Sequence, residues 1–183
     1  MGEIQMSKNS NFYQADKIAK KASGEIEAWL RSFDETVAVH NVEDIKSYQA
    51  KDIDLVWLSI LEEKGPRYCI ATNIEIKADT YYRTGNYFFE TISNTNKNNP
   101  GCFLLTKSDY LYYYFIDEKE LHVIPTKQAQ EWFLANKSKF RERYVDTTGR
   151  NGEVYYQTVG SLVPRKELQK HIQVDIYDLS HIA

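Results

Sequence analysis

The chain contains few of the residues that bind zinc or form disulfides. Of its 183 residues, 2 are cysteines and 4 are histidines. Cys69 and Cys102 form no Cys-x-x-Cys pair, and the histidines show neither His-x-His nor His-Glu-x-x-His spacing. Because zinc sites are built on such spacings, we expect neither a zinc site nor a histidine-based catalytic triad. Each cysteine lies in a short apolar stretch, which predicts two buried free thiols.

Long apolar runs are also missing. No segment approaches the ~20 apolar residues that cross a bilayer, and the polar N-terminus lacks the apolar run of a signal peptide. We therefore expect a soluble, cytoplasmic protein without a membrane partner. The chain is not strongly basic either, since its net charge is -3. Nucleic-acid-binding domains are usually basic, although a basic groove can be a local feature of an acidic protein.

Aromatic residues are abundant, at 14% of the chain with 14 tyrosines, and much of this surface must pack inside. The length of 183 residues fits one domain spanning 1–183, of which 1–10 are polar and expected to be flexible. From Asn11 to about Phe33, apolar residues recur at three- and four-residue steps. This periodicity predicts an amphipathic helix.

Turn-forming residues and short β-rich runs predict the remaining elements. Strands are expected at Thr36–His40, Asp52–Leu61, Arg67–Lys77, Asn86–Ile92, Phe103–Leu105, Tyr110–Ile116 and Leu121–Ile124. A second helix is expected from Pro125 to about Phe140, followed by a hairpin of Tyr144–Thr148 with Glu153–Val159 and a short helix from Pro164 to near His171. This order predicts a single α+β or mixed α/β domain.

Acidic residues and a lysine share one face of two neighbouring strands. Side chains alternate along a strand, so Glu75 and Lys77 point to the same side. Asp52 and Asp54 share a face of the preceding strand in the same way. If the two strands form a hairpin around the Gly65-Pro66 turn, Asp54 comes close to Glu75.

Such a cluster has a chemical use. Two adjacent carboxylates repel each other, and a divalent cation removes that penalty because hard cations prefer oxygen ligands. A nearby lysine can then hold a water or balance charge on a phosphate. These groups together suit the hydrolysis of a phosphodiester bond.

The pattern resembles the PD-(D/E)XK nuclease superfamily, which includes restriction endonucleases and junction resolvases. The matching residues are Asp54, with Ile53 in place of the preceding proline, and Glu75-Ile76-Lys77 in the next strand. Two downstream segments, Thr84–Glu90 (TGNYFFE) and Lys107–Tyr110 (KSDY), are similar to a bacterial and phage branch of that group. The resemblance covers roughly residues 20–135, which it would make the αβββαβ part of that fold.

By this resemblance, the chain has a restriction endonuclease-like core, with a central mixed β-sheet flanked by helices. The implied activity is that of a Mg²⁺-dependent DNA endonuclease, with Mn²⁺ able to substitute. Asp54 and Glu75 would bind the metal together with the Ile76 carbonyl, and Lys77 would orient the attacking water or stabilise the transition state. Many members dimerise to cut two strands, which leads us to consider a homodimer.

Several assignments stay open. Many members of the superfamily add an acid from the first helix, for which Glu25 and Glu27 are the candidates, with Glu25 preferred. Asp52 rivals Asp54, and Glu90 could be a further metal ligand, a partner of Lys77 or a solvated strand end.

The remaining basic and aromatic segments have two interpretations each. A late basic stretch can contact phosphates or form a solvated helix end; its residues are Lys137, Lys139, Arg141, Arg143 and Arg150. The aromatic run Tyr110–Tyr114 can stack on bases or pack in a half-buried strand. Alternatives for the whole chain are an inactive nuclease-fold protein that binds DNA or a protein partner, and an interaction domain whose acidic strand only faces solvent.

Overall fold

A computed structural model describes residues 11–62, 65–148 and 152–182. Its first element is helix α1, Asn11–Arg31, as the apolar spacing predicts. One stripe of this helix is buried, with Ala22, Ile26 and Leu30 fully inaccessible. The predictions for residues 1–10 and for Arg150 lie outside the described residues.

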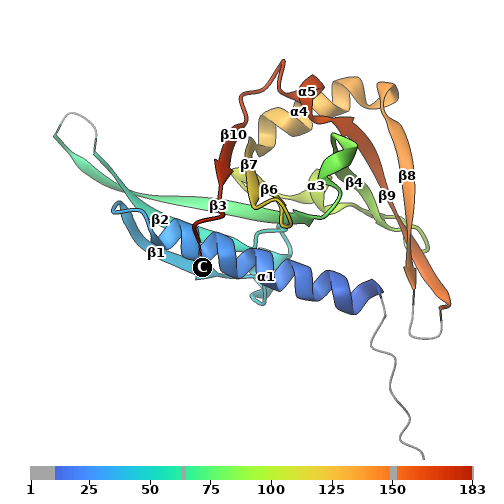
Figure 1. The fold of residues 1–183 in the computed structure, drawn as a ribbon, viewed down its shortest axis with the longest axis horizontal. Coiled ribbons are helices and arrows are strands. Elements are labelled where there is room, and N and C mark those ends of the chain that lie inside the picture. The colour runs from blue at the N-terminus through green and yellow to red at the C-terminus, as the bar shows by residue number, and fades with distance from the viewer. Residues whose placement is uncertain (1–10, 63–64, 149–151, 183) are drawn as a thin grey trace, which may run out of the picture.

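Sheet A is a mixed sheet that forms the centre of the molecule (Figure 1). In the described part of the chain its strand order is β1-β2-β3-β6-β7-β10. The strands are β1 (Thr36–Asn41), β2 (Leu55–Glu62), β3 (Arg67–Asp79), β6 (Tyr110–Phe115), β7 (Glu120–Pro125) and β10 (Asp175–Asp178). β3 and β6 run parallel, and the other neighbours are antiparallel. The sequence did not predict β10.

Sheet B is antiparallel and has the order β5-β4-β9-β8. Its strands are β4 (Asn86–Asn94), β5 (Asn99–Pro100), β8 (Arg141–Thr148) and β9 (Val154–Pro164). The predicted late hairpin is therefore confirmed, and it is longer than expected at its open end, where β8 begins at Arg141 and β9 ends at Pro164. The other helical elements are α2 (Lys46–Gln49), η1 (Tyr82–Thr84), α3 (Cys102–Leu105), α4 (Thr126–Asn136), η2 (Lys137–Lys139) and α5 (Arg165–Leu168).

The two faces of sheet A are covered differently. Helix α1 packs on one face, where Leu55, Ile74 and Tyr112 join its apolar stripe in one core cluster. The opposite face packs against sheet B, α3, α4 and α5, in a second cluster rich in aromatic rings. The protein is thus an α+β fold whose central mixed sheet is flanked by helices.

The connection between the parallel strands β3 and β6 differs from the αβββαβ expectation. It passes through β4, β5 and the four-residue helix α3. Two strands of sheet B and a single helical turn therefore stand where the resemblance predicted a crossover helix. The predicted strand Phe103–Leu105 is wrong, because these residues form α3. A short apolar run does not by itself distinguish a strand from a buried helical turn. Helix α3 follows Gly101, where a Cβ would lie 2.4 Å from the Glu90 carbonyl oxygen.

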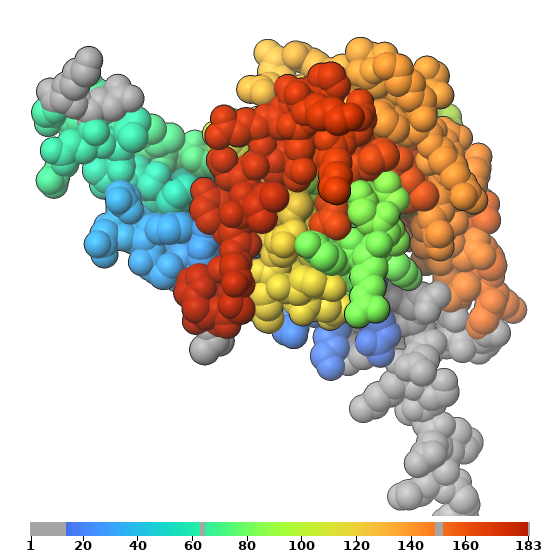
Figure 2. Space-filling view, turned by 45° about the horizontal axis from the view of Figure 1, so that its top comes forward, coloured from blue at the N-terminus to red at the C-terminus, as the bar shows by residue number. Residues whose placement is uncertain are grey.

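The β2–β3 hairpin projects from the body of the molecule (Figures 1 and 2). Because its outer half lies beyond the core, Tyr68 and Ile70 are exposed. The prediction of two buried thiols is therefore wrong for Cys69, which is exposed, while Cys102 is half-buried. Within the described ranges, no helix is long and apolar enough to cross a membrane.

Candidate active site

Strand register places Asp54 beside Glu75. The pairing of β2 with β3 ends at Leu55 and Ile74. Asp54 immediately precedes Leu55, and its amide donates a hydrogen bond of 2.9 Å to the Ile74 carbonyl. Leu55 and Ile74 face α1, so by strand alternation Asp54 and Glu75 both point to the opposite face. The predicted juxtaposition of these two carboxyl groups is therefore observed.

The carboxyl group of Asp54 is partly buried and held by the backbone of β3. Its Oδ2 accepts a hydrogen bond of 2.8 Å from the Ile76 amide, beyond the last β2–β3 pair. It lies close enough to Glu75 for its charge to raise the pKa of that carboxyl. Burial is the largest effect and raises the pKa of Asp54 from 3.8 to about 6, with the charges of Glu43 and Asp52 adding to it.

Glu75 is buried more deeply. Its residue is 7% exposed, and in the described part of the chain its Oε2 has no hydrogen-bond partner. Burial, followed by the charges of Asp54 and Asp52, raises the pKa of Glu75 well above its ordinary value. An unpartnered buried carboxylate oxygen is costly to the fold, so this atom requires a partner such as a proton, a water or a cation.

Lys77 lies on the same face of β3, two residues further along. Its Nζ is 4.0 Å from Oε2 of Glu90 on β4 and 5.9 Å from the centroid of the Phe88 ring. Burial lowers the pKa of Lys77, but neighbouring negative groups outweigh it, so the pKa is raised overall. Burial also raises the pKa of Cys102 far above the neutral range, so this neighbour stays a thiol and the carboxylates are the charges that act on Lys77.

These residues fit a divalent cation. A cavity of about 10 Å³, close to the minimum for one water, lies between Glu75, Lys77 and Glu90; Asp54 does not line it, and its remaining walls are mainly aromatic. The Ile76 amide points toward Asp54, and in a strand the carbonyl of the same residue leaves on that side too. Asp54, Glu75 and the Ile76 carbonyl thus offer the oxygen donors that hard cations prefer.

The donor set is nevertheless incomplete. Within residues 11–62, 65–148 and 152–182, no three His, Cys, Asp or Glu side chains converge as a ready-made metal cage. Two carboxylates and one carbonyl supply only three protein ligands. Mg²⁺ is commonly held by only one or two carboxylates and completes its coordination shell with water and substrate phosphate. These ligands therefore suit an open Mg²⁺ site and not a structural site in which the protein supplies every ligand.

The structure does not bring the predicted helix acid to this cluster. Glu25 lies on the α1 face of sheet A, where Tyr114 donates to it at 2.6 Å and Lys119 forms an ion pair with it. Burial raises the pKa of Glu25, but its bonds to Lys119 and Tyr114 lower it overall. The rival Glu27 binds Asn41 on the same side. The whole sheet therefore separates both helix acids from Glu75.

Asp52 lies in the loop before β2, and not in the strand as the sequence predicted. Its φ of 47° is in the left-handed region, which ends an extended run. Its carbonyl accepts a 2.6 Å hydrogen bond from the hydroxyl of Thr106, which ties the loop to the segment after α3. Asp52 still contributes negative charge to the cluster, because it raises the pKa values of both Asp54 and Glu75.

A larger pocket of about 390 Å³ opens beside Lys77 and Glu90. Sheet B forms one wall, because Glu90 on β4 and Arg143 on β8 lie in register with the same residue, Gly160 of β9. Gly160 has no side chain, and the tip of the Phe88 ring occupies the space where its Cβ would lie. Arg143 comes from the predicted basic stretch, but it sits on a strand and not on a helix end. The sequence carried no signal that would bring it to this pocket.

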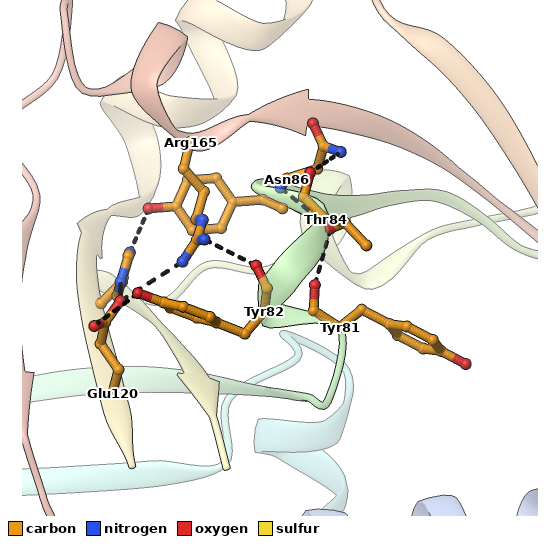
Figure 3. A network of polar contacts seen from close by, with 8 residues as sticks. Tyr81, Tyr82, Thr84, Asn86, Glu120 and Arg165 are labelled. Atoms are coloured by element: carbon orange, nitrogen blue, oxygen red, sulfur yellow. Dashed lines mark hydrogen bonds and ion pairs between the residues drawn. The ribbon is translucent and has the colours of Figure 1, made fainter. Parts of the chain in front are cut away.

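A polar network fastens sheet B to sheet A next to this pocket (Figure 3). Buried His122 on β7 is hydrogen-bonded to Glu120 at 2.7 Å and to the Tyr87 hydroxyl of β4 at 2.6 Å. Arg165 lies 3.6 Å from Glu120 and donates to the Tyr82 carbonyl at 2.9 Å. These contacts hold β4 and the start of α5 against β7 of sheet A.

Comparison of the chain with protein-family models, with curated proteins and with solved structures gave no match. The functional interpretation therefore rests on the geometry of the residues themselves.

Proposed function

We propose that the protein is a metal-dependent endonuclease that hydrolyses phosphodiester bonds in DNA. The observation that carries the proposal is the buried, unpartnered Oε2 of Glu75 beside Asp54, with Lys77 on the same face of β3. The likeness of Asp54 and Glu75-x-Lys77 to the PD-(D/E)XK pattern supports the same activity. The mixed sheet with α1 on one face agrees with that fold only at the coarse level of architecture.

Each residue has a distinct role in this proposal. Asp54, Glu75 and the Ile76 carbonyl would hold the cation, which when bound supplies a polarised phosphate oxygen and a water of lowered pKa. Lys77 carries a positive charge, because its raised pKa keeps it protonated, and this charge would lie beside the phosphate as negative charge develops. Glu90, 4.0 Å from Lys77, would hold the ammonium group in position.

The alternative is an inactive nuclease-fold protein that binds DNA or a protein partner. One observation favours it, namely that no three metal-ligating side chains converge in the described part of the chain. Metal binding and cleavage separate the two candidates.

Calorimetry with Mn²⁺ tests the metal site first. The wild type should bind the ion, while Asp54→Asn and Glu75→Gln should lose binding because each removes one of two charged ligands. Glu118→Gln, an exposed carboxyl in the β6–β7 turn, is the matched control and should bind like wild type. Unchanged Mn²⁺ binding in both variants would show that Asp54 and Glu75 are not metal ligands.

A cleavage assay then tests the chemistry. Supercoiled and branched DNA should be cut in Mg²⁺ by wild type, and Lys77→Met should cut about 10²–10³-fold more slowly, the typical cost of losing one group that stabilises the transition state. If the wild type binds Mn²⁺ yet leaves both substrates intact, the protein is the binding-only alternative.

A further inference from the structure

The pocket beside Lys77 has two features that suggest what it binds. Its volume of about 390 Å³ lies near the lower end of the ~300–1,000 Å³ typical of sites for one small ligand. Its walls are mainly apolar, from Phe88 and Leu162 of sheet B and from Ala78 at the end of β3. A single planar group therefore fits inside, whereas a base pair within a duplex does not.

An exposed aromatic side chain lines the pocket. Tyr81, which follows β3, lines the pocket and is 69% exposed. Its neighbour Tyr82 turns toward Glu120 and Arg165, while Tyr81 points away from that network (Figure 3). Tyr81 and the Phe88 ring thus offer two aromatic surfaces to an occupant. Aromatic surfaces of this kind stack on nucleobases with little dependence on sequence.

Charges at the pocket suit a phosphate backbone. Lys77 lines both this pocket and the small cavity beside Glu75. Arg143 is exposed at the β8 wall and forms no salt bridge within the described part of the chain. Of the two acids that line the pocket, Glu90 is paired with Lys77, and Asp79 accepts hydrogen bonds from the Tyr113 hydroxyl and the Tyr81 amide. Among the described residues, Arg143 is therefore the cation of the pocket that has no acidic partner, and Lys77, at 4.0 Å from Glu90, is the second cation that a phosphate could approach.

The geometry points to a pocket for one unpaired nucleotide of a DNA strand, with its base against Tyr81 and Phe88 and its phosphates between Lys77 and Arg143. This inference rests on the proposed function, because it places the bound strand beside the proposed catalytic cluster. It makes single-stranded or frayed DNA the preferred substrate. Duplex DNA would have to expose a nucleotide first and would lose the free energy of unstacking.

The test is a fluorescence-anisotropy titration in EDTA with full-length protein, so that neither metal binding nor cleavage contributes. The probes are labelled oligothymidylate, a duplex of equal length, and an abasic strand that keeps the phosphates. Oligothymidylate should bind at least tenfold more tightly than the duplex. Tyr81→Ala should weaken oligothymidylate binding about tenfold and leave the abasic strand unaffected, since it removes only a stacking surface. Arg143→Gln should weaken the binding of both strands and reduce its salt dependence.

Matched controls keep the test specific. Tyr155→Ala removes a tyrosine that is 60% exposed and does not line the pocket, and Arg67→Gln removes an exposed arginine from the β2–β3 hairpin; both should bind like wild type. All four positions are exposed, so the variants should keep the wild-type circular dichroism spectrum.

The outcomes separate this inference from the proposed function. If the duplex binds as tightly as the single strand, or if Tyr81→Ala binds like wild type, the pocket inference is overturned even where Mn²⁺ binds. If single-strand preference appears and depends on Tyr81 while Mn²⁺ binding is absent, the pocket inference stands and the nuclease proposal fails.

Discussion

Replacing Asp54 with asparagine should make the metal-free protein more stable at neutral pH. Burial raises the pKa of Asp54 from 3.8 to about 6, so the folded state resists the charged form. At ~1.4 kcal/mol per pH unit, this difference corresponds to about 3 kcal/mol. Asparagine carries no charge and keeps an oxygen to accept the hydrogen bond from the Ile76 amide. Because Asp54 and Glu75 interact, part of this free-energy difference belongs to the pair and not to Asp54 alone. We therefore expect Asp54→Asn to raise the free energy of unfolding by roughly 2–3 kcal/mol.

The sign follows from the direction of the shift. Because the folded pKa of Asp54 lies above the unfolded value, its stabilising contribution is complete below pH 3.8 and is lost as the pH rises through about 6. Wild type and Asp54→Asn should therefore have similar stability near pH 4. They should diverge up to about pH 7, where the variant is the more stable.

Urea denaturation in EDTA across this pH range measures the difference, and thermal melting at neutral pH should show a rise of roughly 4–12 °C for a chain of this size. Asp117→Asn, at an exposed position in the β6–β7 turn, is the control and should show no such divergence. Mn²⁺ at 100 times its dissociation constant should stabilise wild type by about 2.7 kcal/mol and leave Asp54→Asn unchanged. A variant that is less stable at neutral pH, or a difference that does not depend on pH, would refute the reasoning.

Three further substitutions test the surrounding structure. Tyr87→Phe removes the 2.6 Å hydrogen bond to His122 and leaves a buried ring nitrogen unpaired, so urea unfolding should show a loss of about 1–3 kcal/mol. Gly160→Ala places a methyl group 2.4 Å from the Phe88 ring and should cost about 1–3 kcal/mol; an additional Phe88→Leu should recover part of this loss, and no recovery would argue against the contact. Glu25→Gln weakens the half-buried ion pair with Lys119 and should lower the free energy of unfolding by about 1 kcal/mol. Calorimetry should show unchanged Mn²⁺ binding, because the sheet separates Glu25 from the Asp54–Glu75 cluster. A loss of Mn²⁺ binding would show instead that Glu25 contributes to the metal site.

The sequence alone determined the features that depend on local periodicity. The three- and four-residue spacing identified α1, and alternation along β2 and β3 indicated that Asp54 and Glu75 share a face. These inferences succeed because a hairpin and an amphipathic helix bring together residues that are near in sequence. The same local information wrongly predicted a strand at Phe103–Leu105, where α3 lies, and it did not show that Cys69 lies on a part of the hairpin that extends beyond the core.

Only the tertiary structure decided which groups join that hairpin. It placed Glu25 behind the sheet, and it brought Glu90 and Arg143 from sheet B to the side of Lys77. Helix α1 covers one face of sheet A because its apolar stripe buries Ile74 there, and the aromatic residues of β4 and β6 draw sheet B onto the other face. This choice of face depends on the packing of apolar surfaces far apart in sequence, which no local spacing encodes.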